Sequence, residues 1–418
     1  MALFLFGAAI VAFALVSRWV ERAPVTTPMF FVLAGMLFGP LGLGLVQVDI
    51  EWATLNLLAE VTLAIILYTD AARINVGQLR TEHNLPIRML GCGLPLTVVA
   101  GALAGYWLFP ELGWVGLLVL GLILAPTDAA LGQAVVNNPI VPVRIRQALN
   151  VESGLNDGLV LPVLVILLSW TAGEAQGLGY WVQFTAFQLI LGPVVGGLVG
   201  WGGGRLLEQG AKRQWVTPIF QRLGMLALAI TAVGLAELVG GNGFIAAFCA
   251  GLGVGTRGKE FCRPLHQFAE AEGQLLGLIT FVMFGLVMVP LALPHLSWAM
   301  VLYALLSLTL VRMLPVFVSL TGAGIGRVSM AFLGWFGPRG LASILYVLLV
   351  LEGEQLHFGS EIFNLVTITV LVSVFLHGFS AVPLSGIYGR YMKNHVSRLA
   401  PEHQSVEAFP TRHPSQIH

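Results

Sequence analysis

Two carboxylic acids, a hydroxyl and a carboxamide stand close together in Asn150-Val-Glu-Ser-Gly-Leu-Asn-Asp-Gly158, and a long apolar stretch follows directly. This segment is therefore predicted to lie in a membrane-spanning helix. Ser153 and Asp157 are four residues apart and share one helix face, while Glu152 and Asn156 share the adjacent face. An ionisable group at that depth costs at least ~2.5–3.5 kcal/mol, so it is usually kept for function. A carboxylate and a hydroxyl on one face suit a hard monovalent cation or a proton.

The composition indicates the environment of that segment. The 418 residues are 57% hydrophobic and only 10% charged, whereas a soluble domain has roughly 25% charged residues. Most of the chain consists of apolar segments long enough to cross a bilayer, which takes about 20 residues each. Backbone polar groups in lipid must be satisfied within the segment, so helices are expected rather than strands. The predicted fold class is an all-α integral membrane protein.

The hydropathy pattern predicts about thirteen transmembrane helices. They are expected over 2–20, 27–45, 52–70, 87–109, 113–136, 145–171, 180–207, 217–240, 243–257, 268–290, 296–321, 328–352 and 360–390. If the N-terminus is outside, all but two of the 21 Lys and Arg residues fall in inside loops, and the outside loops carry acidic residues instead. Basic residues mark cytoplasmic loops, so a multi-pass protein of the cell (inner) membrane is expected, with its C-terminus in the cytoplasm.

Two of the predicted spans contain helix breakers beside polar residues. The fifth has Ala125-Pro-Thr-Asp128 and the twelfth has Phe336-Gly-Pro-Arg-Gly340. If the seventh span, about 180–207, is a linker, then both broken spans are fifth in their half, and the halves, about 1–171 and 217–391, have opposite topology. Matching broken helices in two inverted six-helix repeats, crossing at the midplane, are typical of a transporter with its site there.

The charged residues inside the predicted spans leave several roles open. Arg312 and Arg339 need carboxylate partners or a water-filled cavity. Arg339 could stabilise the C-terminal carbonyls of a broken helix, repel cations or pair with an acid. Asp128 could bind the ion or cap a helix N-terminus that the break frees. His377 lies within the last predicted span and is interpreted as a packing residue with its hydrogen bonds satisfied.

Other features bound the function. The net charge of +0 gives no argument for a nucleic-acid partner. The three cysteines lack the spacing of a metal site or disulfide framework, and no phosphate-cradling loop is present. We therefore expect no cofactor. The transmembrane domain is assigned to 1–391, and 392–418 to a short cytoplasmic tail that we expect to be flexible.

Four ordered motifs resemble the signature series of the sodium/proton exchangers of the NhaP type. They are Pro126-Thr-Asp128, Glu152-Ser-Gly-Leu-Asn-Asp157, Asn242-Gly-Phe-Ile-Ala-Ala-Phe-Cys-Ala-Gly251 and Phe336-Gly-Pro-Arg-Gly340. The resemblance covers about residues 20 to 390. It implies a homodimer in which a core domain carries the ion across the membrane against a static dimerisation domain.

The resemblance also implies roles for single residues. The candidate residues for the cation and the proton are Asp157, Ser153, Thr127, Asp70, Asn156 and Asp128. Asp157 would bind cation and proton alternately, and two hydroxyls, of Ser153 and Thr127, would add oxygen ligands. The acid from the third span would be Asp70, although Glu60 lies on the same span.

Two further implications concern charge. In the family, an asparagine before the key aspartate accompanies electroneutral exchange, and Asn156 fills that place. Glu152 would pair with Arg312 as a structural ion pair. Because burial penalises a charged carboxylate and a bound cation favours it, the two ions compete for one site. We expect Na⁺ as the cation, with Li⁺ and K⁺ as further candidates.

Other classes of function remain as alternatives. A sodium-coupled symporter of a small organic solute could also use inverted halves, but it would need a larger cavity. A channel or ion sensor is a third hypothesis, against which stands the absence of a filter-like carbonyl repeat. An enzyme is not expected, because the sequence shows no nucleophile and base pair and no metal-ligand constellation.

Overall fold

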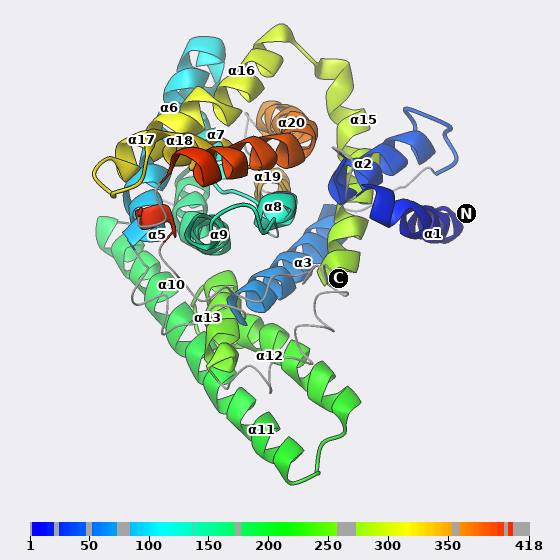
Figure 1. The fold of residues 1–418 in the computed structure, drawn as a ribbon, viewed down its shortest axis with the longest axis vertical. Coiled ribbons are helices and arrows are strands. Elements are labelled where there is room, and N and C mark those ends of the chain that lie inside the picture. Colours follow the sequence, from blue (N-terminus) through cyan, green and yellow to red (C-terminus); the bar gives the residue numbers. More distant parts are fainter. Residues whose placement is uncertain are drawn as a thin grey trace.

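The computed structural model describes residues 2–20, 25–46, 52–72, 84–136, 138–171, 177–256, 273–352, 359–396 and 400–403. All regular secondary structure in these ranges is helical (Figure 1). The described helices follow the predicted spans closely, because each span is a long apolar run that must satisfy its backbone internally. Two of them, the predicted spans 113–136 and 328–352, are interrupted at the proline-containing breakers.

The helices form two packed groups. The first contains α3 and α13 in contact, with α10 and α12 packed on α13, and α2 packed on a later π-helical turn. Its elements are α1 (Ala2–Val20), α2 (Thr27–Phe38), α3 (Trp52–Ala72), α10 (Leu178–Leu198), η3 (Val199–Gly203), α11 (Gly204–Lys212), α12 (Pro218–Leu238), α13 (Gly243–Gly255), helix over 273–283, η4 (Phe284–Met288), α15 (Val289–Ala292) and η5 (Leu293–His295).

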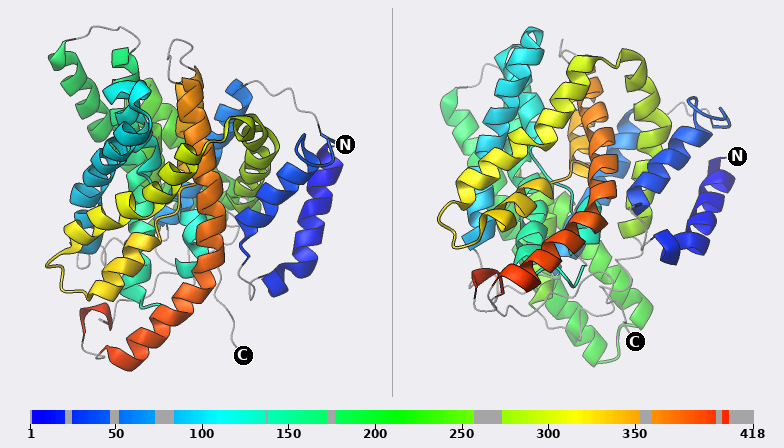
Figure 2. Two further views of the ribbon diagram at one scale, coloured as in Figure 1. Left: turned by 90° about the horizontal axis from the view of Figure 1, so that it is seen from above. Right: turned by 45° about the horizontal axis from the view of Figure 1, so that its top comes forward.

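The second group surrounds the two broken helices. Its elements are α5 (Asn84–Arg88), η1 (Met89–Gly93), α6 (Leu94–Leu108), η2 (Pro110–Leu112), α7 (Gly113–Leu124), α8 (Ala129–Val136), α9 (Val143–Thr171), α16 (Trp298–Leu308), α17 (Leu310–Leu320), α18 (Arg327–Trp335), α19 (Leu341–Glu352), α20 (Gly359–His395) and η6 (Pro401–His403). The groups meet where α19 and α9 contact α3 and α13, and where α15 and α2 contact α20. The long α20 runs through the second group (Figure 2).

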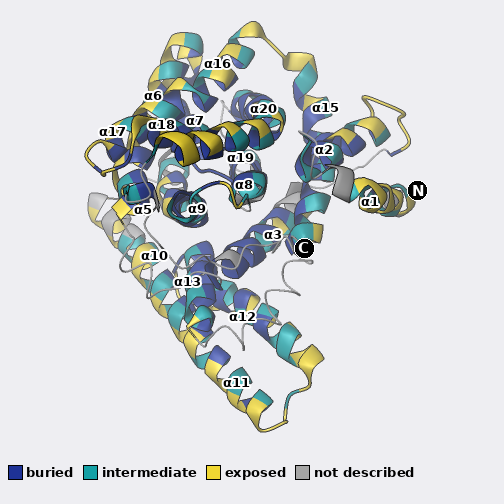
Figure 3. Cartoon of the chain, in the orientation of Figure 1, coloured by how far each residue is buried: buried dark blue, intermediate teal, exposed yellow. Residues whose placement is uncertain are grey.

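Seven helices in the described residues are long and apolar enough to cross a membrane. They cover Asn84–Leu108, Val143–Leu168, Ala186–Lys212, Pro218–Leu238, Gly273–His295, Trp298–Leu320 and Gly359–His395. Shorter apolar helices accompany them, including one half of each broken span, Pro110–Leu124 and Leu341–Leu351. Exposed residues lie on the outer faces of α1, α10, α11 and α12 (Figure 3). The protein is therefore a multi-pass helical membrane protein.

Close helix contact depends on small residues where α10 and η3 pack on α13. A Cβ atom on Gly196 would overlap the main chain of Ala246, and one on Gly200 would overlap that of Ala250. Membrane helices associate through such close backbone approach, since lipid provides no hydrophobic drive between them. This packing fixes α13, which in turn contacts α3 and α9.

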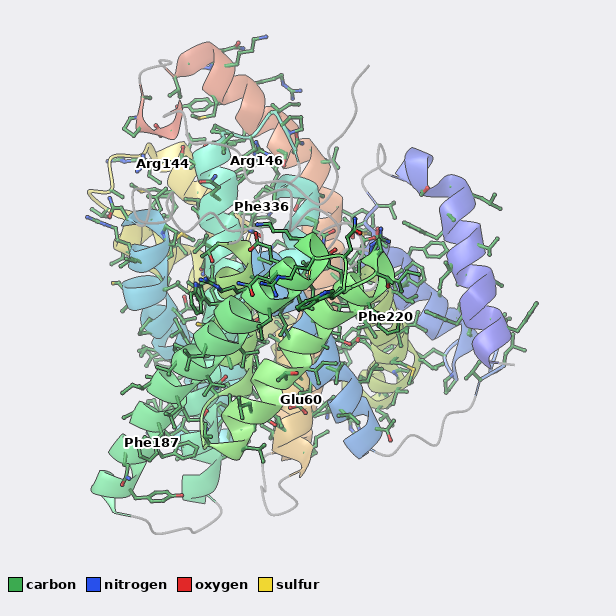
Figure 4. All side chains as sticks on the ribbon, turned by 90° about the horizontal axis from the view of Figure 1, so that it is seen from below. Glu60, Arg144, Arg146, Phe187, Phe220 and Phe336 are labelled. Carbon is green, nitrogen blue, oxygen red and sulfur yellow. The ribbon has the colours of Figure 1, made fainter. Side chains whose placement is uncertain are left out.

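Of the tail that we expected over 392–418, the structure describes 392–396 and 400–403, and the rest lies outside the described residues. Helix α20 continues to His395, and Pro401–His403 form the short helix η6 against the start of α9. Glu402 is buried, and the Arg144 guanidinium donates to the Pro401 carbonyl at 3.0 Å. These polar contacts hold the segment, which composition alone did not indicate. Arg144 and Arg146 lie at this end of the molecule, and Phe187 lies toward the opposite end (Figure 4).

Candidate functional site

The two broken helices cross at their breaks. Helix α7 ends at Leu124 and α8 begins at Ala129, while α18 ends at Trp335 and α19 begins at Leu341. The Asp128 N–H donates to the Pro338 carbonyl at 2.8 Å, so the two connecting segments lie side by side. Each break leaves helix-end groups without intrahelical partners, which need other partners when buried. The site is built from the groups that supply them.

Asp128 caps two helices at once. One carboxylate oxygen accepts from the Leu341 N–H at 2.6 Å, at the start of α19. The other accepts from the Leu131 N–H at 3.4 Å, in the first turn of α8. Negative charge is stabilising at helix N-termini. Of the two roles open for Asp128, these contacts are those of a helix cap, and the role in ion binding stays a prediction.

Glycine makes this cross-contact possible. A Cβ atom on Gly340 would overlap the Asp128 carboxylate, and one on Gly337 would overlap the Arg312 guanidinium. The glycines of the Phe336–Gly340 motif thus admit two charged side chains against the backbone of the second break.

Arg339 stabilises a helix C-terminus, that of α7. It is fully buried, and its Nη1 donates to the Ala125 carbonyl at 2.8 Å and the Pro126 carbonyl at 3.1 Å. Both acceptors lie at the C-terminal end of α7, where positive charge is stabilising. Among the three roles left open for Arg339, these contacts show the stabilisation of broken-helix carbonyls. Asp128 and Arg339 therefore support each other's breaks.

A small polar cluster lies between the first break and α9. The Thr127 and Ser153 hydroxyl oxygens are 2.9 Å apart, and the Asn156 amide donates to Thr127 Oγ1 at 2.8 Å. All three side chains are buried. This arrangement brings together three of the residues predicted for the cation, from elements separated by more than 20 residues in sequence. Oxygen atoms grouped in this way can coordinate a hard cation.

Asp157 lies one helical turn after Ser153 and is buried, with 4% of its surface exposed. Its main-chain carbonyl accepts from the Tyr346 hydroxyl at 2.5 Å, which connects α9 to α19. Tyr346 is fully buried and was not identified from the sequence. The signal available was weak: Gly340, Ser343 and Tyr346 are three residues apart, which places small and polar groups along one face of α19.

Glu152 and Arg312 form a buried ion pair. The Arg312 Nη2 lies 2.6 and 2.7 Å from the two carboxylate oxygens, and each side chain is at most 1% exposed. The pair joins α9 to α17 beside the second break. Compensation of two charges is what allows both to be buried. Because Glu152 is paired with Arg312, Asp157 is the α9 carboxylate that we consider together with the Thr127 and Ser153 hydroxyls.

The two candidate acids of the third span both lie on α3. Asp70 lies on α3, which contacts α9, but its side chain is outside the described residues. Glu60 lies on the same helix and is partly exposed. Among the described residues, no three His, Cys, Asp or Glu side chains are grouped to hold a metal ion.

Buried carboxylates beside two helix breaks that are in contact, within a multi-pass helical protein, are typical of a secondary transporter. The chain matches the family described as "Sodium/hydrogen exchanger, transmembrane" over residues 8–385. Because that match covers most of the chain, the protein belongs to the sodium/hydrogen exchanger family. This family membership confirms the resemblance to the sodium/proton exchangers that was based on the four motifs, and the family is one of transporters.

Similar proteins carry names of two cation specificities. The K(+)/H(+) antiporter NhaP of Alkalimonas amylolytica is 27% identical over 409 residues, covering 96% of this chain and 68% of that protein. The Na(+)/H(+) antiporter NhaP of Pseudomonas aeruginosa is 28% identical over 340 residues, covering 76% and 78%. The chain spans about two thirds of the length of the K(+)/H(+) antiporters that it matches.

The fold is similar to that of a solved antiporter. The structure of the sodium proton antiporter MjNhaP1 from Methanocaldococcus jannaschii at pH 8 superposes with a TM-score of 0.76. The match covers 94% of this chain and 99% of that chain at 19% sequence identity. At that identity the similarity establishes the fold alone.

Proposed function

We propose that this protein exchanges one monovalent cation for one proton, and that both ions bind alternately at Asp157. The observation that carries the proposal is the buried pair of hydroxyl oxygens, of Thr127 and Ser153, 2.9 Å apart and one turn from Asp157. These groups offer neutral oxygen ligands beside one carboxylate. A site of that composition suits a singly charged hard cation.

Competition at one carboxylate is sufficient for exchange. A buried Asp157 is disfavoured as a free anion, so it holds either a proton or a cation. If the site changes sides only when it is occupied, the two ions move in opposite directions. Asn156 is a neutral amide that donates to Thr127, so the position directly before Asp157 adds no second titrating group to the site. This supports electroneutral, one-for-one exchange.

The cation is Na⁺ in our proposal, with K⁺ and Li⁺ to be tested beside it. The relatives named above include both sodium and potassium antiporters. Selectivity depends on the number of oxygen ligands and on cavity size. Asp70 is proposed as a further ligand from α3, while Asp128 is proposed to act on the site through its capping of α8 and α19.

Alternating access is proposed to move the second helix group against the first. The broken helices, Asp157 and the ion pair all belong to the second group, and α3 and α13 of the first group face it. We assign about thirteen spans in two inverted halves, 1–171 and 217–391, with a linker over 180–207. We further propose a homodimer in the inner membrane, with the C-terminus in the cytoplasm.

The test is cation-driven collapse of a pH gradient in proteoliposomes. Na⁺, K⁺ and Li⁺ are added separately to wild type and to Asp157→Asn. We expect dissipation in wild type and none in the variant, because an amide cannot exchange a proton for a cation. Asp157→Asn should retain the wild-type elution profile in detergent, which controls for folding.

Two outcomes would contradict the proposal. Exchange by folded Asp157→Asn would show that another group carries the ions. No response of wild type to any of the three cations would remove the assignment of monovalent cation exchange. The symporter alternative would require an added organic solute for cation-driven movement, and no described feature favours it.

A further inference from the structure

A serine and a histidine on α20 contact both sides of the second helix break. Ser373 and His377 are four residues apart, so they share one face of α20. Both are buried, at 0% and 1% exposure. The Ser373 hydroxyl oxygen accepts from the Arg339 N–H at 2.7 Å, and His377 Nε2 lies 2.9 Å from the Trp335 carbonyl oxygen.

Both ring nitrogens of His377 lie within hydrogen-bond distance of a partner. A carbonyl oxygen can only accept, so the Nε2–H tautomer of His377 donates to the Trp335 carbonyl. His377 Nδ1 lies 3.2 Å from Ser373 Oγ and 3.1 Å from the Ser373 main-chain carbonyl oxygen, so His377 contacts Ser373 in either tautomer. The serine oxygen keeps lone pairs for the Arg339 N–H.

These bonds make one continuous chain across the break. It runs from the Arg339 N–H through Ser373 and His377 to the Trp335 carbonyl. Helix α20 therefore connects the end of α18 with the segment before α19. Trp335 adds a third link, since its indole N–H donates to Ser380 Oγ at 3.0 Å. The Arg339 N–H is thereby satisfied from α20, and the Trp335 carbonyl has His377 as a second partner beside the Gly337 N–H, which donates to it at 2.9 Å.

The same series of hydrogen bonds leads, through Arg339, to the candidate cation site. The Arg339 side chain holds the carbonyls of Ala125 and Pro126, which immediately precede Thr127. A shift of the Arg339 backbone would therefore move the support of the Thr127 hydroxyl. Small displacements of a ligand weaken ion binding without removing any ligand.

We propose that Ser373 and His377 are positioning residues of the cation site, acting through Arg339. The inference rests on the proposed function, in which Thr127 is a cation ligand. Neither residue touches the ion. Their loss should change the apparent affinity for the cation more than the maximal rate, because the carboxylate that carries the ions is unchanged.

The experiment measures half-saturating cation concentration and maximal rate in proteoliposomes. Loss of a buried hydrogen bond is expected to raise the half-saturating concentration by roughly three- to tenfold in His377→Ala and in Ser373→Ala. The maximal rate should stay within about twofold. The half-saturating concentration of the double variant should not exceed that of the more impaired single variant, because the two residues belong to one series of hydrogen bonds.

Amide replacements separate positioning from general packing. In His377→Gln the longer side chain can still donate to the Trp335 carbonyl, so its half-saturating concentration should stay near the wild-type value. In His377→Asn the shorter side chain reaches only Ser373, so it should behave like His377→Ala. This comparison also holds if the alanine variants fail to fold. Ser385→Ala is the matched control, because Ser385 is buried on α20 and its hydroxyl has no hydrogen-bond partner among the described residues.

The outcomes separate this inference from the proposed function. If wild type shows no exchange, the proposed function fails. If wild type exchanges and Asp157→Asn does not, but His377→Ala and His377→Asn have wild-type half-saturating concentrations, the positioning role alone is wrong. Equal effects of His377→Gln and His377→Asn, or effects in Ser385→Ala as large as in Ser373→Ala, would likewise overturn it.

Discussion

The two helix breaks have similar backbones and different chemistry. Each contains a proline, and each frees one helix C-terminus and one helix N-terminus. The first break, Ala125–Asp128, carries a hydroxyl and a carboxylate. The second, Phe336–Gly340, carries an arginine and two glycines. The hydroxyl of Thr127 faces Ser153 and Asn156 on α9, whereas the second break offers no side-chain oxygen of its own to an ion.

The two breaks therefore have different roles: one carries a candidate ligand, and the other supports it. The break with the candidate ligand is supported by Arg339 of the break without one. The second break is supported in turn by Asp128 and by α20. A ligand-bearing segment must satisfy its backbone without using up the oxygens that bind the ion. Asp128 and Arg339 meet that requirement, because each charged side chain comes from one break and supports the backbone of the other.

The largest predicted effect comes from removing one member of the Glu152–Arg312 ion pair beside the second break. Arg312→Ala leaves Glu152 buried and unpaired, which should destabilise the protein by roughly 3–5 kcal/mol. The thermal unfolding midpoint in detergent should fall steeply. In Glu152→Leu/Arg312→Met both charges are removed, so the midpoint and exchange should recover. A double variant with a wild-type midpoint and no exchange would contradict a purely structural role for the pair.

The next effect tests the double cap in the first break. Asp128→Ala removes the acceptors for two helix N-termini, and each cap contributes about 1 kcal/mol. We expect a loss of roughly 2–3 kcal/mol in unfolding free energy, since buried N–H groups are also left unsatisfied. Thr127→Ser keeps a hydroxyl in the same break and serves as the control. Wild-type stability of Asp128→Ala would mean that the cap contacts are not needed.

A smaller effect tests the close approach of the two breaks. Gly340→Ala places a methyl group against the Asp128 carboxylate, and such overpacking costs about 1–3 kcal/mol. Gly132→Ala in α8 is the control, because nothing lies within 4 Å of its Cβ position. That control should keep or raise the unfolding midpoint, as alanine favours helix. A similar midpoint for both variants would show that the breaks can separate without loss.

The smallest effect concerns the outer end of the second broken helix. Helix α18 begins after Gly326, which has no side chain to cap it, and Glu402 supplies the carboxylate. Its Oε1 accepts from the Gly326 N–H at 2.7 Å and from the Ser329 hydroxyl at 3.2 Å. Glu402→Ala should lower stability by about 1 kcal/mol, measured by the same unfolding midpoint. Glu208→Ala, whose carboxylate pairs with exposed Lys212, should have no measurable effect.

The sequence was informative about local structure. Apolar runs predicted the ranges of helices such as α9, α13 and α20, and proline beside glycine or threonine predicted both breaks. The motif resemblance predicted the family. These features are local because a membrane helix must satisfy its own backbone, so composition and breakers determine where helices lie. The functional roles of Asp157 and Asp70 stay predictions for the exchange assay.

Other features required the tertiary structure. Arg339 had three open roles because a sequence does not state which carbonyls lie within reach of a guanidinium. His377 was interpreted as a packing residue, although it contacts a break 42 residues away in the chain. Glu402 lay in an expected flexible tail and instead caps a helix that begins 75 residues earlier in the sequence.

The sequence by itself determined the membrane environment, the helix ranges, the two breaks and the acidic and hydroxyl residues that suit a cation. The tertiary structure decided which helix ends those charges satisfy. The physical reason is that a break frees N–H and C=O groups whose partners must come from other segments. Which segment supplies each partner depends on how α9, α17, α19 and α20 pack around the crossing, and no local pattern encodes that arrangement.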